Sequence, residues 1–585
     1  MSEATHRWRS RTRGEAASWA MAAAAVLAAV VVQLYTAADA SGPIYYTDEV
    51  GYLSNAQLLA GVGEPRDLSF TSYYLGWSLL IVPIWWLTQD PATVYQAAVG
   101  LSVVCGLALI VPLTAIARRT GLSLPAAVTV AAVVSAAPAR VLTSGYALAE
   151  NLLTLVLAGT VLAAWRYAEH PTHGRAALLG STAAMLFLTH GRTLPVLLVC
   201  MLWFAMLAVR GTWSAVTGIG CAVALAVPMY ALNQWVAGQM YLEGAGREER
   251  GILRLLSLDP GQAVVAGTGQ AWYAVVSWLG LSMIGLTVLL VAAGRHLRAR
   301  RLSVEVWAAL AVAGATMVSV VWISAVVGET ATRIDTFAYG RYLDPFATIL
   351  SVVGLAVVVR RAQRQTVRGA AAAAAVVAGA FLLAVVPRIP SGPGTWWVPL
   401  NVSGLLHWDW PNVTTASTGP WVAATVLAAV VLTLSLVQRR WASHAVLGVV
   451  AVVLVGGSVL GEAKTLRPFY AAWYDSFTLR EDVAELTDGP VSFDTADTTT
   501  VEGGGDTVSR NAYQFWLAPR TVEVFDSDAS DPPTELVIAR KEWPRAEALG
   551  ARKVADDTGL FDNALWVLPG DLLDELAASG GLETP

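Results

Sequence analysis

Apolar runs of about twenty residues, separated by short loops that hold most of the charge, recur along this chain. A run of that length is long enough to cross a bilayer as an α-helix. The pattern predicts an α-helical polytopic membrane protein with about 13 transmembrane helices. Their approximate positions are 15–37, 92–117, 122–141, 147–167, 176–190, 193–209, 214–237, 272–294, 304–327, 343–360, 368–387, 420–438 and 443–461.

The short loops between these runs are strongly basic on one side only. Arginines precede the first run, and the later basic loops fall on the same side: Arg118 with Arg119, Arg166 with Arg175, Arg210, Arg295 to Arg301, Arg360 to Arg368, and Arg439 with Arg440. Because basic loops stay in the cytoplasm, we expect a plasma-membrane protein with a cytoplasmic N-terminus, residues 1–14. The first run lacks a convincing cleavage site, so we interpret it as a retained helix.

The first outer loop, 38–91, holds two shorter segments. Residues 50–61 are amphipathic and predict a short helix lying on the membrane surface. Residues 72–88 are short for a span and carry Trp77, Trp85 and Trp86. This predicts a second interfacial helix with its indole rings at headgroup level.

The composition changes after residue 464. Apolar runs shorten, acidic residues multiply, and helical patterns separate strand patterns at 491–494, 522–525, 535–539 and 564–568. An odd number of spans places this segment outside. We predict a membrane domain over 15–464 and a small extracytoplasmic α/β domain over 465–585, where roughly 120 residues suffice for a separate core.

The overall composition adds two limits. The chain is 55% hydrophobic and only 14% charged, so its net charge says little about partners, and we expect membrane lipids but no nucleic acid among them. Cys105, Cys200 and Cys221 lie in apolar runs without metal-binding spacing. We therefore expect neither a disulfide nor a cysteine metal site.

With this topology, a selected set of polar residues faces the outer compartment. Asp48 and Glu49 form an acidic pair shortly after the first span. The other candidates follow along the outer loops, and they are Tyr52, Glu150, His190, Arg192, Arg333, Arg341 and Tyr342. Topology does not explain the outer arginines, because it favours basic residues on the inside.

These residue types point to transfer from a lipid phosphate. A carboxylate can take a proton from an attacking hydroxyl, and arginines suit a phosphate leaving group through bidentate hydrogen bonds. Water-soluble nucleotide donors are absent outside a bacterial membrane, which makes a lipid carrier the natural donor in a bacterium. Two carboxylates are too few to define a metal site, and the sequence leaves a divalent cation open as a cofactor.

Several motifs, taken in order and spacing over about 15–365, resemble the GT-C superfamily of glycosyltransferases that use polyprenyl-phosphate sugars. The similarity is greatest to the branch with protein mannosyltransferases, aminoarabinose transferases and RgtA/B/C/D-like bacterial proteins. The motifs are the first helix, Asp48-Glu49 with Tyr52, Tyr73-Tyr74-Leu75-Gly76-Trp77, a span ending Ala117-Arg118-Arg119, and Gly340-Arg341-Tyr342-Leu343-Asp344-Pro345, which resembles an R-Y-x-x-P segment.

The resemblance implies an inverting transfer of a hexosyl or pentosyl group from a polyprenyl phosphate to a cell-envelope glycan, lipid or protein. It implies that Asp48 deprotonates or orients the acceptor and that Glu49 is a second acidic contact. Aminoarabinose transferases carry an arginine where this chain has Gly51, and their lysine has no counterpart near Ser72. Phosphate binding then shifts to other basic residues, Arg192, Arg333 or Arg341, and the sugar is not identified.

Each candidate also has a structural interpretation. The acidic pair could be the solvated end of the first helix, Glu49 alone an ion pair, and Glu150 a hydrogen bond to a neighbouring helix. His190 with Arg192 could cap a re-entrant turn, and Arg341 with Tyr342 could anchor the interface.

Two other functions also fit the span pattern. One is a lipid or glycan transporter or flippase, although the sequence has no evident internal repeat. The other is a non-catalytic assembly partner whose terminal domain does the binding.

Overall fold

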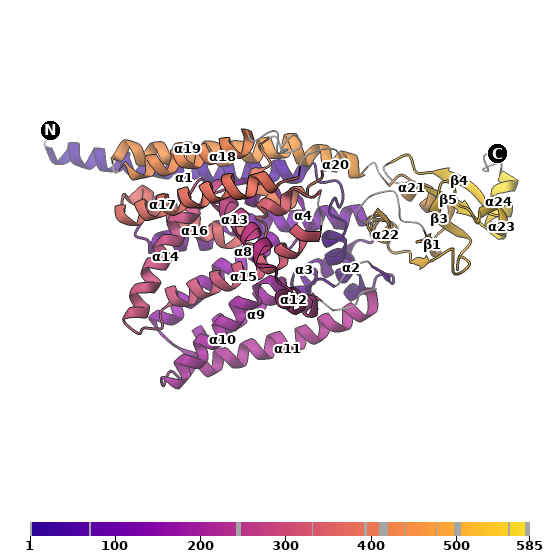
Figure 1. The fold of residues 1–585 in the computed structure, drawn as a ribbon, viewed down its shortest axis with the longest axis horizontal. Coiled ribbons are helices and arrows are strands. Elements are labelled where there is room, and N and C mark those ends of the chain that lie inside the picture. Colours follow the sequence, from indigo (N-terminus) through magenta and orange to yellow (C-terminus); the bar gives the residue numbers. More distant parts are fainter. Residues whose placement is uncertain are drawn as a thin grey trace.

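The computed structural model describes residues 3–68, 72–241, 247–329, 332–390, 395–408, 419–437, 439–474, 477–496, 505–559 and 562–579. The molecule is elongated, with the N-terminal helix at one end of its long axis and the C-terminal sheet at the other (Figure 1). Long helices fill the space between them. The predicted class, a helical membrane protein with a small C-terminal α/β part, is confirmed.

Ten of the described helices are long and apolar enough to cross a membrane. They are Glu15–Ala38, Pro91–Arg119, Glu150–Glu169, Gly191–Val209, Ser214–Met240, Leu281–Arg298, Val304–Val327, Arg364–Arg388, Gly419–Leu436 and Trp441–Ala472. A broken pair, Leu124–Ser135 with Pro138–Gly145, is bent by 71° and adds an eleventh if it counts as one span. The chain is therefore a multi-pass membrane protein, and the count of 13 remains a prediction.

The helices before the first strand are α1 (Glu3–Ala38), α2 (Asp48–Ala60), α3 (Leu75–Leu87), α4 (Pro91–Ala108), α5 (Ile110–Arg119), α6 (Leu124–Ser135), α7 (Pro138–Val141), α8 (Glu150–Glu169), α9 (His173–Thr189), α10 (Leu194–Val209), α11 (Ser214–Met240), α12 (Arg247–Leu256), α13 (Pro260–Val276), α14 (Leu281–Arg298), α15 (Val304–Glu329), α16 (Asp344–Arg360), α17 (Arg364–Ala380), α18 (Gly419–Leu436), α19 (Arg440–Gly461), α20 (Arg467–Tyr474) and α21 (Leu479–Leu486). Short 3₁₀ or π turns join several of them, including η1 (Leu142–Gly145), η2 (Gly191–Thr193), η3 (Asp335–Ala338), η4 (Phe381–Val385), η5 (Val386–Arg388), η6 (Pro399–Leu405) and η8 (Glu462–Leu466).

The predicted single span over 272–294 is wrong. Two helices share this stretch, because α13 ends at Val276 and α14 begins at Leu281. Between them the backbone turns through left-handed φ angles of 54° at Leu279 and 77° at Gly280. Glycine adopts that conformation without steric cost, and it ends the first helix.

The two short helices predicted within 38–91 form, but they pack inside the protein. In α2 the residues from Glu49 to Gln57 are buried. In α3 the indoles of Trp77 and Trp85 are buried and donate to backbone carbonyl groups, while the Trp86 ring is exposed. The expectation of indole rings at headgroup level is therefore wrong for Trp77 and Trp85, because both rings find partners in the core.

Glycines allow two pairs of helices to approach closely. A Cβ atom at Gly180 of α9 would lie 2.1 Å from the Gly218 carbonyl oxygen of α11. A Cβ atom at Gly354 of α16 would lie 2.1 Å from the Leu281 carbonyl oxygen of α14. Small residues are the usual means by which membrane helices pack backbone to backbone. This packing fixes α16, whose side chains are mostly buried, in the middle of the bundle.

The C-terminal part holds a five-stranded sheet in the order β2-β1-β3-β5-β4. The strands are β1 (Val491–Asp494), β2 (Val522–Phe525), β3 (Leu536–Arg540), β4 (Arg552–Asp556) and β5 (Asn563–Val567), with helices α22 (Gly505–Trp516), α23 (Ala546–Leu549) and α24 (Asp571–Ser579). β1 runs parallel to β2 and β3, and β5 runs antiparallel to β3 and β4. The sequence pattern missed β4, an edge strand without clear apolar alternation.

The C-terminal part contacts the segment 38–91 directly. The Trp516 indole of α22 donates a hydrogen bond to the Tyr46 hydroxyl at 3.3 Å. A Cβ atom at Gly63 would lie 2.3 Å from the Pro519 carbonyl oxygen. The last long helical run extends to Ala472, past the boundary predicted at residue 464.

We expect Gly180→Ala to lower the melting temperature of the purified protein, because the new methyl group would force α9 away from α11. The matched control is Gly220→Ala on α11, where a Cβ atom meets nothing within 4 Å and alanine is favoured over glycine by about 1 kcal/mol in a helix. Equal melting temperatures for the two variants would contradict this account of the packing.

Candidate active site

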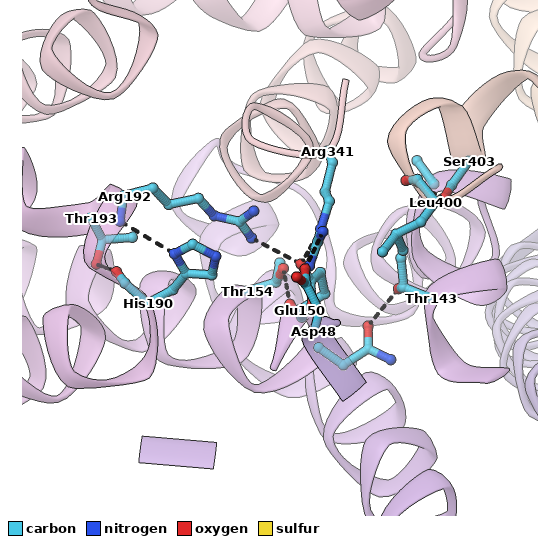
Figure 2. Close-up of polar contacts among 12 residues, drawn as sticks. Asp48, Thr143, Glu150, Thr154, His190, Arg192, Thr193, Arg341, Leu400 and Ser403 are labelled. Atoms are coloured by element: carbon cyan, nitrogen blue, oxygen red, sulfur yellow. Dashed lines mark hydrogen bonds and ion pairs between the residues drawn. The ribbon is translucent and has the colours of Figure 1, made fainter. Parts of the chain in front are cut away.

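Arg341 bridges two carboxylates from distant parts of the chain. Its Nη1 lies 2.6 Å from Asp48 Oδ2, and its Nε lies 2.6 Å from Glu150 Oε1 (Figure 2). The side chains of Arg341 and Glu150 are only 5% and 2% exposed, and that of Asp48 is 15% exposed. Burial alone would lower the pKa of Arg341, but Glu150 and Asp48 outweigh it and raise that pKa well above its ordinary value.

A second arginine approaches the same acid. Arg192 Nη2 lies 3.5 Å from Glu150 Oε1, and the guanidinium stands over the Tyr342 ring at 5.0 Å. Figure 2 shows Arg192 and Arg341 reaching Glu150 from different segments. His190 Nδ1 accepts a hydrogen bond from the Arg192 backbone N–H, and its ring meets the Tyr342 ring edge-on. The four predicted residues His190, Arg192, Arg341 and Tyr342 therefore lie together.

The Arg192 guanidinium is buried with unused hydrogen-bonding capacity. Within the described part of the chain, its three nitrogen atoms and Glu150 Oε2 have no hydrogen-bond partner. A buried charged group without hydrogen bonds costs on the order of 1–3 kcal/mol or more. The guanidinium is thus prepared to bind an anion that brings its own oxygen atoms.

Four charged site residues lie at or near the start of a helix, and they are Asp48, Glu150, Arg192 and Arg341. Asp48 and Glu150 are the first residues of α2 and α8, Arg192 lies in η2 just before α10, and Arg341 lies just before α16. Helix N-termini carry partial positive charge and unpaired N–H groups, so they favour anions. The site therefore suits carboxylates and phosphate groups.

A tyrosine shortly before α3 binds the second oxygen of Asp48. The Tyr73 hydroxyl donates to Asp48 Oδ1 at 2.6 Å. Gly51 allows this contact, because a Cβ atom there would lie 2.2 Å from the Tyr73 ring. Tyr52 is buried, and its ring packs on Tyr73 with the ring centroids 5.2 Å apart. An arginine at position 51 would collide with this tyrosine.

Glu49 has surroundings different from those of its neighbour. It is fully buried, and its two oxygens accept four hydrogen bonds, from the backbone N–H groups of Ile44, Tyr45 and Ala147 and from the Tyr95 hydroxyl. These donors fasten the first loop to the segment before α8. These partners are neutral hydrogen-bond donors, whereas the structural alternative drawn from the sequence is an ion pair, and a catalytic role for Glu49 stays a prediction.

Arg333, another predicted phosphate contact, is engaged elsewhere. Its Nε and Nη2 each lie 3.0 Å from an oxygen of Asp335, and its guanidinium stands over the Trp396 ring at 4.9 Å. Asn401 donates to the same carboxylate at 2.7 Å. Arg333 thus belongs to a paired cluster that adjoins the site, because the Asn401 carbonyl oxygen accepts the backbone N–H of Arg341 at 3.3 Å.

Sequence reasoning missed Arg140 near this site. Its side chain is buried and donates to the hydroxyl groups of Thr154 and Thr143, and Thr154 lies one turn after Glu150 on α8. Pro138 breaks the apolar run just before it. A charged residue in a broken membrane helix is itself a signal of a functional site.

No metal centre is evident in the described ranges, because no group of three or more His, Cys, Asp or Glu side chains comes together there. Asp48 and Glu150 are joined by the Arg341 guanidinium.

This chain is similar to known proteins in structure and not in sequence. No family model and no curated protein sequence matches this chain. The structure is similar to ArnT from Cupriavidus metallidurans in the apo state (16% identity, TM-score 0.49, 95% of this chain and 99% of that one) and bound to undecaprenyl phosphate (14%, 0.48, 94% and 98%). It is also similar to the Archaeoglobus fulgidus oligosaccharyltransferase (12%, 0.40, 89% and 69%).

At such identities and TM-scores the likeness concerns the general path of the chain. It does not extend to a substrate or to the role of any residue.

We expect the stability of the protein to depend on the ionisation of Glu49. Burial raises the pKa of Glu49 from 4.5 to about 7, although hydrogen bonds from Tyr45, Ala147, Ile44 and Tyr95 oppose the shift. The folded protein then binds more protons than the unfolded chain between these values, so the free energy of unfolding falls as pH rises through this window. As pH rises from 4.5 to about 7, the melting temperature should fall more steeply in the wild type than in Glu49→Gln. Parallel curves for the two proteins would contradict the raised pKa of Glu49.

Proposed function

We propose that this protein is a membrane glycosyltransferase that moves a sugar from a polyprenyl-phosphate donor to a hydroxyl group of an extracytoplasmic acceptor. The observation that carries the proposal is the arrangement of a partly exposed carboxylate, Asp48, against two buried guanidinium groups, Arg341 and Arg192. The Asp48 carboxylate can accept a proton, and the two guanidinium groups can bind a phosphate. The acceptor is a cell-envelope glycan, lipid or protein.

The donor phosphate binds between the two guanidinium groups. Arg192 offers three nitrogen atoms without hydrogen-bond partners among the described residues, and arginine matches phosphate oxygens in a bidentate manner. The helix starts at α10 and α16 add a field that favours the anion. Glu150 lies between the two arginines and holds them in place through Oε1.

Asp48 acts as the general base. The acceptor oxygen attacks the anomeric carbon, the bond from that carbon to the phosphate oxygen breaks, and the hydroxyl proton passes to the Asp48 carboxylate. The polyprenyl phosphate leaves with the negative charge that the arginines stabilise. A phosphate on Arg341 also competes with Asp48 for the same guanidinium, so donor binding frees the base where it is needed. A single displacement of this kind inverts the configuration at the anomeric carbon.

The alternative function, a lipid or glycan transporter, has less support. Transporters bind their cargo near the middle of the membrane, at interrupted helices. Here Asp48 begins α2, a short helix of the segment 38–91 that contacts the C-terminal part, and it does not lie in an interrupted span.

We expect Asp48→Asn to lower kcat by on the order of 10²–10⁴, the usual contribution of general-base catalysis, with little change in KM for the donor. The assay is sugar transfer from polyprenyl-phosphate sugars by the purified protein. Asp259→Asn is the control, because Asp259 only caps α13 and asparagine caps equally well. Full activity in Asp48→Asn would overturn the assignment of the base.

We expect Arg192→Gln to raise KM for the donor about 10- to 100-fold, the loss of charge-assisted hydrogen bonds to phosphate. Its melting temperature should fall only modestly, because the guanidinium gives up a 3.5 Å ion pair with Glu150 and its contact with the Tyr342 ring but no hydrogen bond to the described residues. Arg254→Gln is the control, because Arg254 contacts Trp322 away from the cluster. An unchanged KM in Arg192→Gln would remove this residue from the donor site.

A further inference from the structure

A separate cavity lies inside the helix bundle, with none of the four charged site residues in its wall. Its volume is about 360 Å³, and its lining comes mainly from α8, α14, α15 and α16. Volumes of about 300–1,000 Å³ are typical of sites for small molecules. The cavity is thus large enough for a ligand, or for part of one.

The cavity follows almost the whole length of α16. Its lining on this helix runs from Phe346 through Ile349, Leu350, Val353 and Val357 to Arg360. This spacing of three or four residues defines one face of a helix, and at 1.5 Å per residue it covers roughly 21 Å. One leaflet of the hydrocarbon core is about 15 Å thick, so the lined length matches a single extended lipid chain with its polar end.

The two ends of the cavity differ in polarity. The polar residues, Arg119, Thr120, Glu305, Arg360 and Gln363, all belong to the ends of helices at the arginine-rich side of the bundle. Toward Phe346 the lining is apolar. A ligand that matches this wall has a charged group at the arginine-rich end and a hydrocarbon chain that points toward the middle of the membrane.

The rim arginines retain donors for an anion. Arg119 pairs with Glu169 and stands over the Trp165 ring at 5.4 Å, and Arg360 donates to the Thr120 carbonyl oxygen. A guanidinium has five N–H donors, so neither contact exhausts it. Glu305 is the one acid in the described lining, and it faces His296 at 3.6 Å.

We propose that this cavity binds one acyl chain of an anionic phospholipid from the cytoplasmic leaflet, with the lipid phosphate held by Arg119 and Arg360. The orientation follows from the positive-inside rule. A polyprenyl donor would place its phosphate at Arg192 and Arg341, at the opposite end of the bundle. Its charged group would then not meet the arginine-rich end of this cavity. The bound chain fills the space between α14, α15 and α16, and it stabilises their packing.

The test uses the full-length protein in detergent, with phosphatidylglycerol as the anionic probe, phosphatidylcholine as the zwitterionic probe, and polyprenyl phosphate as a competitor. Bound lipid is measured by native mass spectrometry and stabilisation by the melting temperature. We expect the wild type to bind one phosphatidylglycerol and to melt at a higher temperature with it. Arg360→Gln, at the rim, should weaken phosphatidylglycerol binding about fivefold and leave phosphatidylcholine binding unchanged.

A matched pair of variants on α15 tests the cavity itself. Ala308→Phe fills it, whereas Leu310→Phe adds the same ring two residues away, where the side chain is 49% exposed. We expect Ala308→Phe to lose the lipid and Leu310→Phe to keep it. Wild type without bound phospholipid, retention in Ala308→Phe, or displacement by polyprenyl phosphate would each overturn the proposal. None of these results would affect the glycosyl-transfer proposal, because that activity is assayed separately.

Discussion

The site depends on one guanidinium that neutralises two acids inside the protein. Removing charges from water costs several kcal/mol for each ion, and only close pairing with good geometry offsets that cost. Arg341 provides such pairing to Asp48 from the first loop and to Glu150 from α8. Arg341 itself is fixed by α16, which the glycine contacts with α14 hold in the middle of the bundle. Three segments that are distant in the sequence therefore meet at Arg341, where one guanidinium group neutralises both carboxylates.

The second arginine makes the cluster asymmetric. Arg341 has its partners, whereas Arg192 is buried beside an aromatic ring with nitrogen atoms that the described residues do not satisfy. A partly satisfied polar network is costly in a folded protein, and natural proteins tolerate it mainly at functional sites. This imbalance, rather than the number of charges, distinguishes the cluster from a structural ion pair such as Arg333 with Asp335.

The sequence predicted the helical class and most span positions because the length of an apolar run has a direct physical meaning. It also selected Arg192 and Arg341, because the positive-inside rule does not explain arginines on the predicted outer side, and Asp48, because it belongs to an acidic pair shortly after the first span. It could not separate Asp48 from Glu49. Neighbouring residues on a helix point about 100° apart, and the backbone donors that bind Glu49 depend on the folded path of the loop.

The contact between Trp516 and Tyr46 gives the C-terminal sheet a bearing on the evolution of this chain. Tyr46 stands two residues before Asp48, the proposed base, so a change in the terminal sheet that displaces Trp516 would also displace the segment that carries Asp48. Swapping in a different terminal unit would leave a gap beside the first loop unless that loop changed as well. The two segments, more than 400 positions apart in the sequence, are thus expected to diversify as a matched pair.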